Sequence, residues 1–186
     1  MIYTNQTVKG GTHGLFESSR IKSTDIGHLY DALVKDSEGN AIDVDNGVAI
    51  KIGAFTGNGL QEVEATIAAV GDKIAVVGAP ALVKDAFTKA QAQANNFYIP
   101  AGQDAKAYQL VEEDIFAVAS YQFTDGSVAN VAKDAYVVVD GNGKWVAQTS
   151  EPSADTYGFI GKIHSVAVGT FYTMVRIEVI KNEQVA

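Results

Sequence analysis

Apolar and polar residues alternate over several short stretches of the chain, which is typical of half-buried β-strands. The clearest case is residues 62–67, which read Glu-Val-Glu-Ala-Thr-Ile. Residues 48–53 alternate in the same way, and residues 73–77 form a short apolar run of strand length. These patterns predict strands through the middle of the chain.

Three pairs of adjacent segments have the length and the intervening polar residues of β-hairpins. They are residues 107–111 with 114–119, residues 136–139 with 144–148, and residues 158–168 with 171–180. The second pair is joined by Asp-Gly-Asn-Gly, whose residues tolerate the positive φ angles that hairpin turns need. The longest predicted strands belong to the third pair.

One segment has helical rather than strand periodicity. Pro80 suits a first helical turn, and apolar residues then recur at spacings of four, three and four from Val83 to Ala94. The sequence therefore predicts one short α-helix over about residues 80–95. Together with about eight to ten strands, this predicts a mainly β protein, an antiparallel β-barrel or sandwich.

The first forty residues are polar and are punctuated by glycine and serine. We interpret residues 1–40 as an extended N-terminal arm and residues 41–186 as a single β-rich domain. Scattered apolar side chains in the arm are candidate anchors for a partner surface. These residues are Ile2, Tyr3, Val8, Leu15, Phe16 and Ile21.

The composition limits the classes of function. The chain has 186 residues with a hydrophobic fraction of 47%, which fits one folded domain and excludes a fully disordered protein. A net charge of −8 does not provide the basic surface that phosphate contacts need, so we expect no nucleic-acid partner. Cysteine is absent from the sequence, which excludes disulfides, cysteine-ligated metals and thiol catalysis.

No apolar stretch approaches the roughly 20 residues that a bilayer-spanning helix requires. Residues 1–9 also lack the basic and apolar regions of a secretion signal. We therefore expect a soluble protein that is made in a cytoplasm and has no membrane partner.

The chain offers few candidates for catalysis. His13, His28 and His164 lack the three- or four-residue spacing that places two ligands on one helical face, and we interpret the first two as exposed and the third as lying on a sheet face. Residues 141–144 end like a phosphate-binding loop, but Trp145 stands where serine or threonine would bind magnesium. We therefore expect no enzyme activity and no cofactor.

Two acidic segments are candidates for calcium. Residues 43–47 begin like a calcium-binding loop, but Val48 stands where that loop requires glycine. Residues 112–114, Glu-Glu-Asp, join two predicted strands and are typical of a solvated turn. We predict no metal site, and a surface calcium ion stays an open alternative.

Two parts of the sequence resemble a known family when they are taken together. Residues 96–118 contain Phe-Tyr, Ala-Gly, Ala-Tyr-Gln-Leu and Asp-Ile-Phe-Ala-Val in that order. Residues 158–163 contain Ile-Gly-Lys-Ile, and the β-rich segment 171–179 follows. This order resembles the capsid decoration, or head-stabilising, proteins of tailed phages that infect Gram-positive bacteria.

The resemblance implies a structural virion protein that lies on the capsid surface and stabilises the head. It implies the major capsid protein as a partner and, by analogy with other cement proteins, self-association as a homotrimer. The apolar anchors of the N-terminal arm suit the addition of a strand to an exposed edge of the capsid shell, and packing of the arm on the chain's own barrel stays an open alternative. Two alternatives stay open. One is another phage structural subunit, from the tail or the shell, and the other is a small β-barrel module that binds a ligand or carbohydrate.

Overall fold

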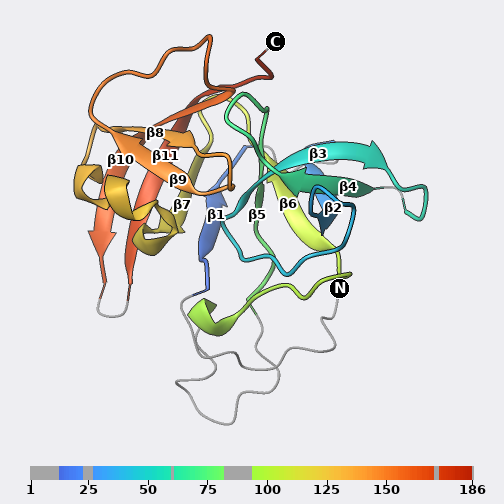
Figure 1. Cartoon of the computed structure of the whole chain (residues 1–186). Helices are drawn as coiled ribbons and strands as arrows, with labels where there is room; N and C mark the ends of the chain where they lie inside the picture. The colour runs from blue at the N-terminus through green and yellow to red at the C-terminus, as the bar shows by residue number, and fades with distance from the viewer. Residues whose placement is uncertain (1–12, 23–26, 60, 82–93, 170–171, 186) are drawn as a thin grey trace.

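The computed structural model describes residues 13–22, 27–59, 61–81, 94–169 and 172–185. They form a mainly β structure, as the alternating patterns predict. A six-stranded antiparallel sheet and a closed five-stranded barrel lie side by side (Figure 1). Three short 3₁₀ helices accompany the strands in the described residues: η1 (Ala94–Asn96), η2 (Ser120–Gln122) and η3 (Asp125–Asn130).

The six-stranded sheet contains both the start and the end of the described chain. Its strands are, in spatial order, β1 (Phe16–Arg20), β7 (Ile115–Ala119), β11 (Thr173–Asn182), β10 (Phe159–Val168), β8 (Tyr136–Val139) and β9 (Trp145–Gln148). Every neighbouring pair is antiparallel. The predicted hairpins at β8–β9 and β10–β11 are confirmed, except that residues 170–171 lie outside the described residues.

The barrel is built from the middle of the chain. Its strands are, in order around the barrel, β2 (Leu29–Lys35), β4 (Glu62–Ile67), β3 (Ala49–Phe55), β5 (Ala75–Val77) and β6 (Ala105–Gln109), and β6 closes on β2. The β2–β4 pair is parallel and the others are antiparallel. As the alternation predicts, Val63 and Ala65 point into the barrel core while Glu64 is exposed.

Alanine is frequent in the barrel core. Five strands enclose a narrow interior, because barrel diameter falls with the number of strands. Small side chains therefore occupy many inward positions, together with a few larger ones such as Phe97 and Ile50. The buried alanines of this core are Ala32, Ala65, Ala75, Ala79, Ala105 and Ala107.

A second core lies between the barrel and the sheet. Strand β5 is buried on both faces, because Ala75 and Val77 belong to the barrel core while Val76 belongs to the core shared with the sheet. The apolar run at residues 73–77 thus has a physical cause: neither face of this strand meets water. Ala49 and Ile50 divide between the same two cores.

An aromatic cluster fills the centre of the shared core. The rings of Phe116, Trp145 and Phe159 lie with their centroids 5.3 to 6.3 Å apart, in the tilted and edge-on arrangements that aromatic rings prefer. The indole Nε1 of Trp145 donates a hydrogen bond of 2.9 Å to the carbonyl oxygen of Gly47. Trp145 therefore connects strand β9 of the sheet directly to the segment that enters β3 of the barrel.

The predicted hairpin over residues 107–119 is wrong. Strand β6 belongs to the barrel and β7 to the sheet, so the two strands do not pair. Asp114 is fully buried, and its carboxylate accepts hydrogen bonds from the backbone amides of Val111, at 2.9 Å, and Lys22, at 2.5 Å. Glu113 has a φ of 70°. The acidic segment is therefore a crossover between two sheets that a buried carboxylate stabilises, and not a solvated hairpin tip.

The described part of residues 1–40 does not form the separate arm that the sequence predicts. Strand β1 pairs with β7 in the sheet, and β2 belongs to the barrel. Leu15 and Ile21 are buried, and Phe16 packs against Tyr108 and Phe116. The apolar surfaces of Leu15 and Ile21 are therefore covered within this chain, and Phe16 is half-buried against the shared core.

Some expectations fall on residues that the structure does not describe. The candidate anchors Ile2, Tyr3 and Val8 lie outside the described residues. The predicted helix over about residues 80–95 lies outside them for residues 82–93. Residues 94 and 95, the last two of the predicted helix, belong to the 3₁₀ helix η1.

We expect the Trp145→Ala variant to lose about 3–5 kcal/mol of folding free energy, because it removes the largest buried side chain and its hydrogen bond to Gly47. Chemical denaturation with tryptophan-independent circular dichroism measures the loss. Val168→Ala is the control, since Val168 is 84% exposed and its truncation should change stability by less than about 0.5 kcal/mol. Equal losses in the two variants would show that the aromatic cluster does not stabilise the fold.

Candidate functional site

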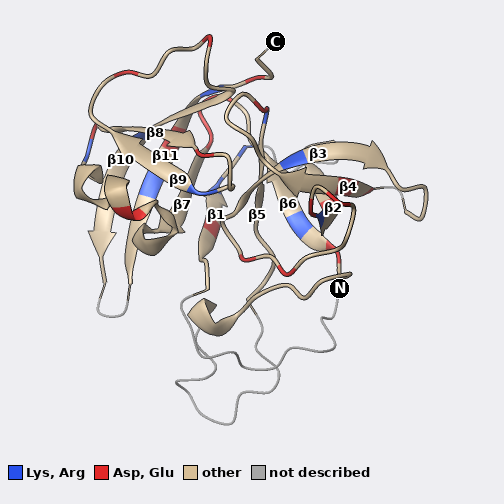
Figure 2. Ribbon diagram, in the orientation of Figure 1, with Lys and Arg blue, Asp and Glu red and all other residues tan. Residues whose placement is uncertain are grey.

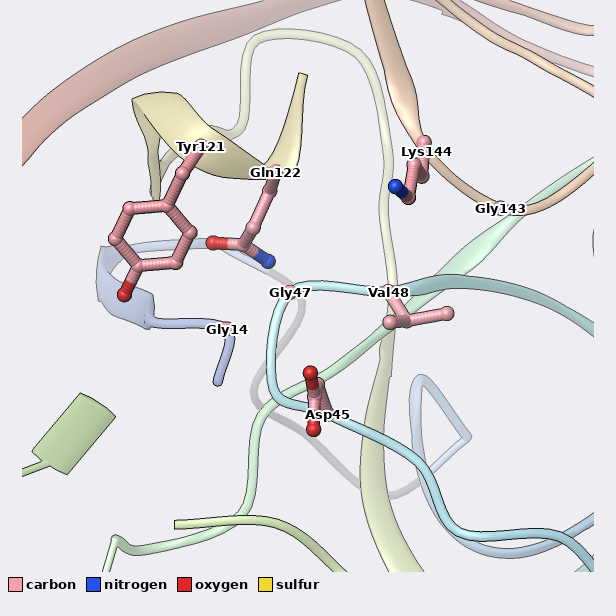
Figure 3. Close-up of a pocket in the computed structure, with 8 residues that line it drawn as sticks. All are labelled: Gly14, Asp45, Gly47, Val48, Tyr121, Gln122, Gly143 and Lys144. Atoms are coloured by element: carbon pink, nitrogen blue, oxygen red, sulfur yellow. The ribbon is translucent and has the colours of Figure 1, made fainter. Parts of the chain in front are cut away.

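A small cavity lies where four segments of the chain meet between the sheet and the barrel. Its volume is about 140 Å³. The N-terminal segment, the chain before β3, helix η2 and the β8–β9 turn all contribute to its wall, and Figure 3 shows their side chains around it. The lining residues are Gly14, Asp45, Gly47, Val48, Tyr121, Gln122, Gly143 and Lys144.

The buried side-chain amide of Gln122 holds three of these segments together. Its Oε1 accepts hydrogen bonds from the backbone amides of Leu15, at 3.0 Å, and Ala119, at 2.8 Å. Its Nε2 donates to the carbonyl oxygen of Asn46 at 2.7 Å. One side chain thereby satisfies three buried backbone groups from three different segments.

Two glycines make this close approach of backbone segments possible. A Cβ atom on Gly14 would lie 1.9 Å from the carbonyl oxygen of Asn46. Gly47 has a φ of 80°, and a Cβ there would lie 2.0 Å from Nε2 of Gln122. Any larger residue at either position would push the segments apart, so both glycines are required by the packing.

A histidine and a carboxylate lie at the edge of the same cavity. Nδ1 of His13 is 2.7 Å from Oδ1 of Asp45, and the imidazole ring stacks on the ring of Tyr98. The hydroxyl of Tyr121 donates to the carbonyl oxygen of His13 at 2.8 Å. His13 is therefore half-buried and held by its neighbours, which corrects the expectation that it is exposed.

The environment of Tyr121 makes its phenol harder to ionise. Burial raises the pKa of Tyr121 to about 12, and the negative charge of Asp45 and the nearby Tyr172 add to the effect. The group is therefore protonated over the whole physiological range. In that state it is a hydrogen-bond donor that fastens the N-terminal segment to η2.

The polar groups around this cavity hold segments of the chain together and leave little room for a ligand. Its volume is below the roughly 300 to 1,000 Å³ of typical small-molecule sites. The polar atoms of Gln122, Tyr121 and Asp45 already hold other parts of the chain. Among the described residues, no group of three or more histidine, aspartate or glutamate side chains is arranged to hold a metal ion.

The residues suggested as calcium ligands also have structural partners. Asp43 accepts a hydrogen bond from the backbone amide of Ala101 at 2.9 Å. The side chain of Asn46 bonds both the amide and the carbonyl of Ala79, at 2.8 and 2.9 Å. Segment 43–47 therefore fastens the loop that enters β3 to neighbouring segments.

The glycine-rich turn at residues 140–144 is a hairpin turn. Oδ1 of Asp140 accepts hydrogen bonds from the amides of Asn142 and Lys144, both at 2.8 Å. His28 and His164 lie apart from the cavity: His28 immediately precedes β2, and His164 is exposed on β10. The structure thus does not bring the three histidines to one site.

A broader surface hollow of about 550 Å³ lies over β2, β3, β4 and the β8–β9 turn. Lys51 and Asp72 form an ion pair of 2.6 Å in its wall. Burial, the largest single influence, would raise the pKa of Asp72, but the hydrogen bonds from Lys51 and from the backbone amide of Ala69, together with the charge of Lys51, outweigh it and leave the pKa below its usual value. Both groups thus neutralise each other, and the hollow presents no unpaired charge from this pair.

The sequence patterns did not predict the long-range hydrogen bonds of Gln122, and they indicated the central position of Trp145 in the core only in part. Gln122 stands 107 positions from Leu15 and 76 from Asn46, so no local spacing reveals the contacts. Trp145 gave a partial signal, because it lies in an alternating segment and alternation predicts burial.

Comparisons with protein-family models, with curated proteins and with solved structures find no match to this chain. Within the part of the chain that the structure describes, no helix has the length and apolar character needed to cross a bilayer.

We expect Gln122→Leu to destabilise the protein by about 2–4 kcal/mol, because it leaves two buried amides and one carbonyl without a partner. Urea denaturation measures the change. The matched control is Gln148→Leu in β9, whose side chain makes no hydrogen bond to the described residues and should change stability little. A loss as small as in the control would contradict the role given to Gln122.

The pKa of Tyr121 predicts a loss of stability in alkali. Its folded pKa of about 12 exceeds the ordinary 10.0, so its contribution is complete below pH 10 and is lost as pH rises toward 12. Tyr121→Phe should flatten this part of the stability curve, measured by denaturation at a series of alkaline pH values. Phenolate absorbance should lose one group that titrates near pH 12. Loss of a group titrating near pH 10 instead would show that Tyr121 is not shielded.

Proposed function

We propose that this chain is a structural virion protein of a tailed phage, which binds the outside of the capsid as a decoration protein and stabilises the head. The sequence resemblance supports this proposal. The matching segments, residues 96–118, 158–163 and 171–179, contribute to β6 and β7 and to the long hairpin β10–β11. They therefore include the crossover between barrel and sheet, which is a structural rather than a catalytic part of the fold.

The observation that carries the proposal is the position of the exposed apolar side chains. Val168 at the end of β10 is 84% exposed, and Phe55 at the end of β3 is 64% exposed. The β10–β11 and β3–β4 hairpins project at opposite sides of the molecule (Figure 1). Apolar groups at projecting hairpin ends suit contacts with a neighbouring protein surface.

The alternative of a carbohydrate-binding module gains nothing from the single tryptophan. Such modules stack sugars on exposed aromatic rings, whereas Trp145 has 0% of its surface exposed. The expected partner therefore stays the major capsid protein, with the virion surface as the location.

The direct test adds the purified protein to heads that lack it, prepared from the phage that encodes the chain. We expect saturable binding on the outer surface, counted as copies per head by cryo-electron microscopy. Decorated heads should also resist heating better than bare heads, because the protein bridges neighbouring capsid subunits. Absence of saturable binding would overturn the proposal.

A single substitution at the exposed end of the β10–β11 hairpin tests whether this hairpin is the capsid contact. Val168→Asp should weaken binding to heads by at least about tenfold while the unfolding transition stays unchanged, since the side chain is exposed in the free protein. Val128→Asp in η3 is the matched control, because Val128 is also exposed, at 42%, but belongs to neither hairpin. Equal binding of the two variants would exclude the β10–β11 hairpin as the capsid contact.

A further inference from the structure

The outer face of the six-stranded sheet carries an ordered arrangement of charge. Antiparallel pairing places side chains of β1, β7 and β11 in rows on the face opposite to the shared core. The first row is Glu17, Ala117 and Arg176, and the second row is Arg20, Ile115 and Glu178. Charges of both signs therefore lie on both flanking strands, β1 and β11 (Figure 2).

The two arginines of this face are the only arginines in the sequence. Both line one groove of about 100 Å³, together with Glu17 and Ser19. The groove exists because Ala117, between the flanking charges, has a small side chain. Among the described residues, neither Arg20 nor Arg176 lies within ion-pair distance of a carboxylate, and both are exposed.

The four charges form a checkerboard. Glu17 and Arg20 lie on β1, and Arg176 and Glu178 lie on β11 in the corresponding rows. If a second copy is turned by 180° about an axis parallel to β7, its Arg176 faces Glu17 and its Glu178 faces Arg20. The same contacts recur on the other side of the axis, so the four charges of each copy meet opposite charges.

We propose that this outer face binds a second copy of the chain through a twofold axis parallel to β7. A self-complementary patch is the requirement for a twofold interface, in which the same surface is used by both copies. Apolar groups add to the contact, since Ile115 and Met174 are half-buried and Ile180, on the same side of β11, is 43% exposed. Arginine is favoured in such interfaces because its planar guanidinium pairs with carboxylates through two parallel hydrogen bonds.

This association is independent of the proposed capsid role, because it needs no other protein. It differs from the homotrimer implied by the resemblance, since a twofold axis pairs copies. Val168 pairs with Thr173, so its side chain lies on the face opposite to Met174 and Arg176, and a dimer leaves that contact free.

Charge exchange provides the test. In one variant, Arg20→Glu and Arg176→Glu make all four checkerboard positions acidic, and in the other, Glu17→Arg and Glu178→Arg make all four basic. Sedimentation equilibrium should show a wild-type dimer, and each variant alone should associate more than about a hundredfold more weakly, because like charges then face each other. The two variants mixed in equal amounts should form a dimer again, with an affinity within about tenfold of the wild type.

The control variant is Lys73→Glu with Lys133→Glu, which changes the net charge as much as the acidic variant but on exposed positions elsewhere. It should dimerise like the wild type. If a charge-exchange variant fails to unfold cooperatively, the wild type alone still decides the matter: its dimer must weaken as sodium chloride is raised from about 0.05 to 0.5 M. A wild-type monomer at about 100 µM, a trimer, a salt-insensitive dimer or failure of the mixed variants to associate would overturn the proposal.

Discussion

The contact between the six-stranded sheet and the barrel is the constraint on which the rest of the structure depends. Trp145, Phe116 and Phe159 fill the space between the two units, and the indole of Trp145 is hydrogen-bonded to Gly47 at the entrance to the barrel. Burial of three large aromatic rings supplies a substantial apolar contribution, and the hydrogen bond fixes the position in which they pack. The barrel and the sheet therefore stabilise each other.

The polar groups near this contact complete it. Gln122 bonds three backbone groups from distant segments, and Tyr121 fastens the N-terminal segment through His13. Buried polar groups that are fully paired fix one arrangement of a core, since any shift leaves a group unsatisfied. The cavity lined by Tyr121 and Gln122 thus serves the architecture, and the contacts proposed for partners lie elsewhere, at the hairpin ends and on the outer face of the sheet.

Local periodicity predicted the strands because alternation and burial have the same cause in a sheet. The hairpin that it predicted between β6 and β7 is wrong, because the chain passes there from the barrel to the sheet through a crossover that contains the buried Asp114. Sequence alone suggests a solvated turn for Glu-Glu-Asp, since carboxylates are normally exposed. The hydrogen bonds of Gln122 around the cavity could not be predicted from the sequence either. Its partners are distant in the chain and give no spacing signal.

The sequence by itself determined the mainly β class and the two hairpins β8–β9 and β10–β11, because each depends on neighbours along the chain. Only the tertiary structure decided that these strands divide into a sheet and a closed barrel. It also decided that Leu15 and Ile21 are core residues and that four charges of β1 and β11 form one pattern. The reason is that strand order and the pairing of β1 with β7 depend on contacts across about a hundred positions, which local periodicity does not record.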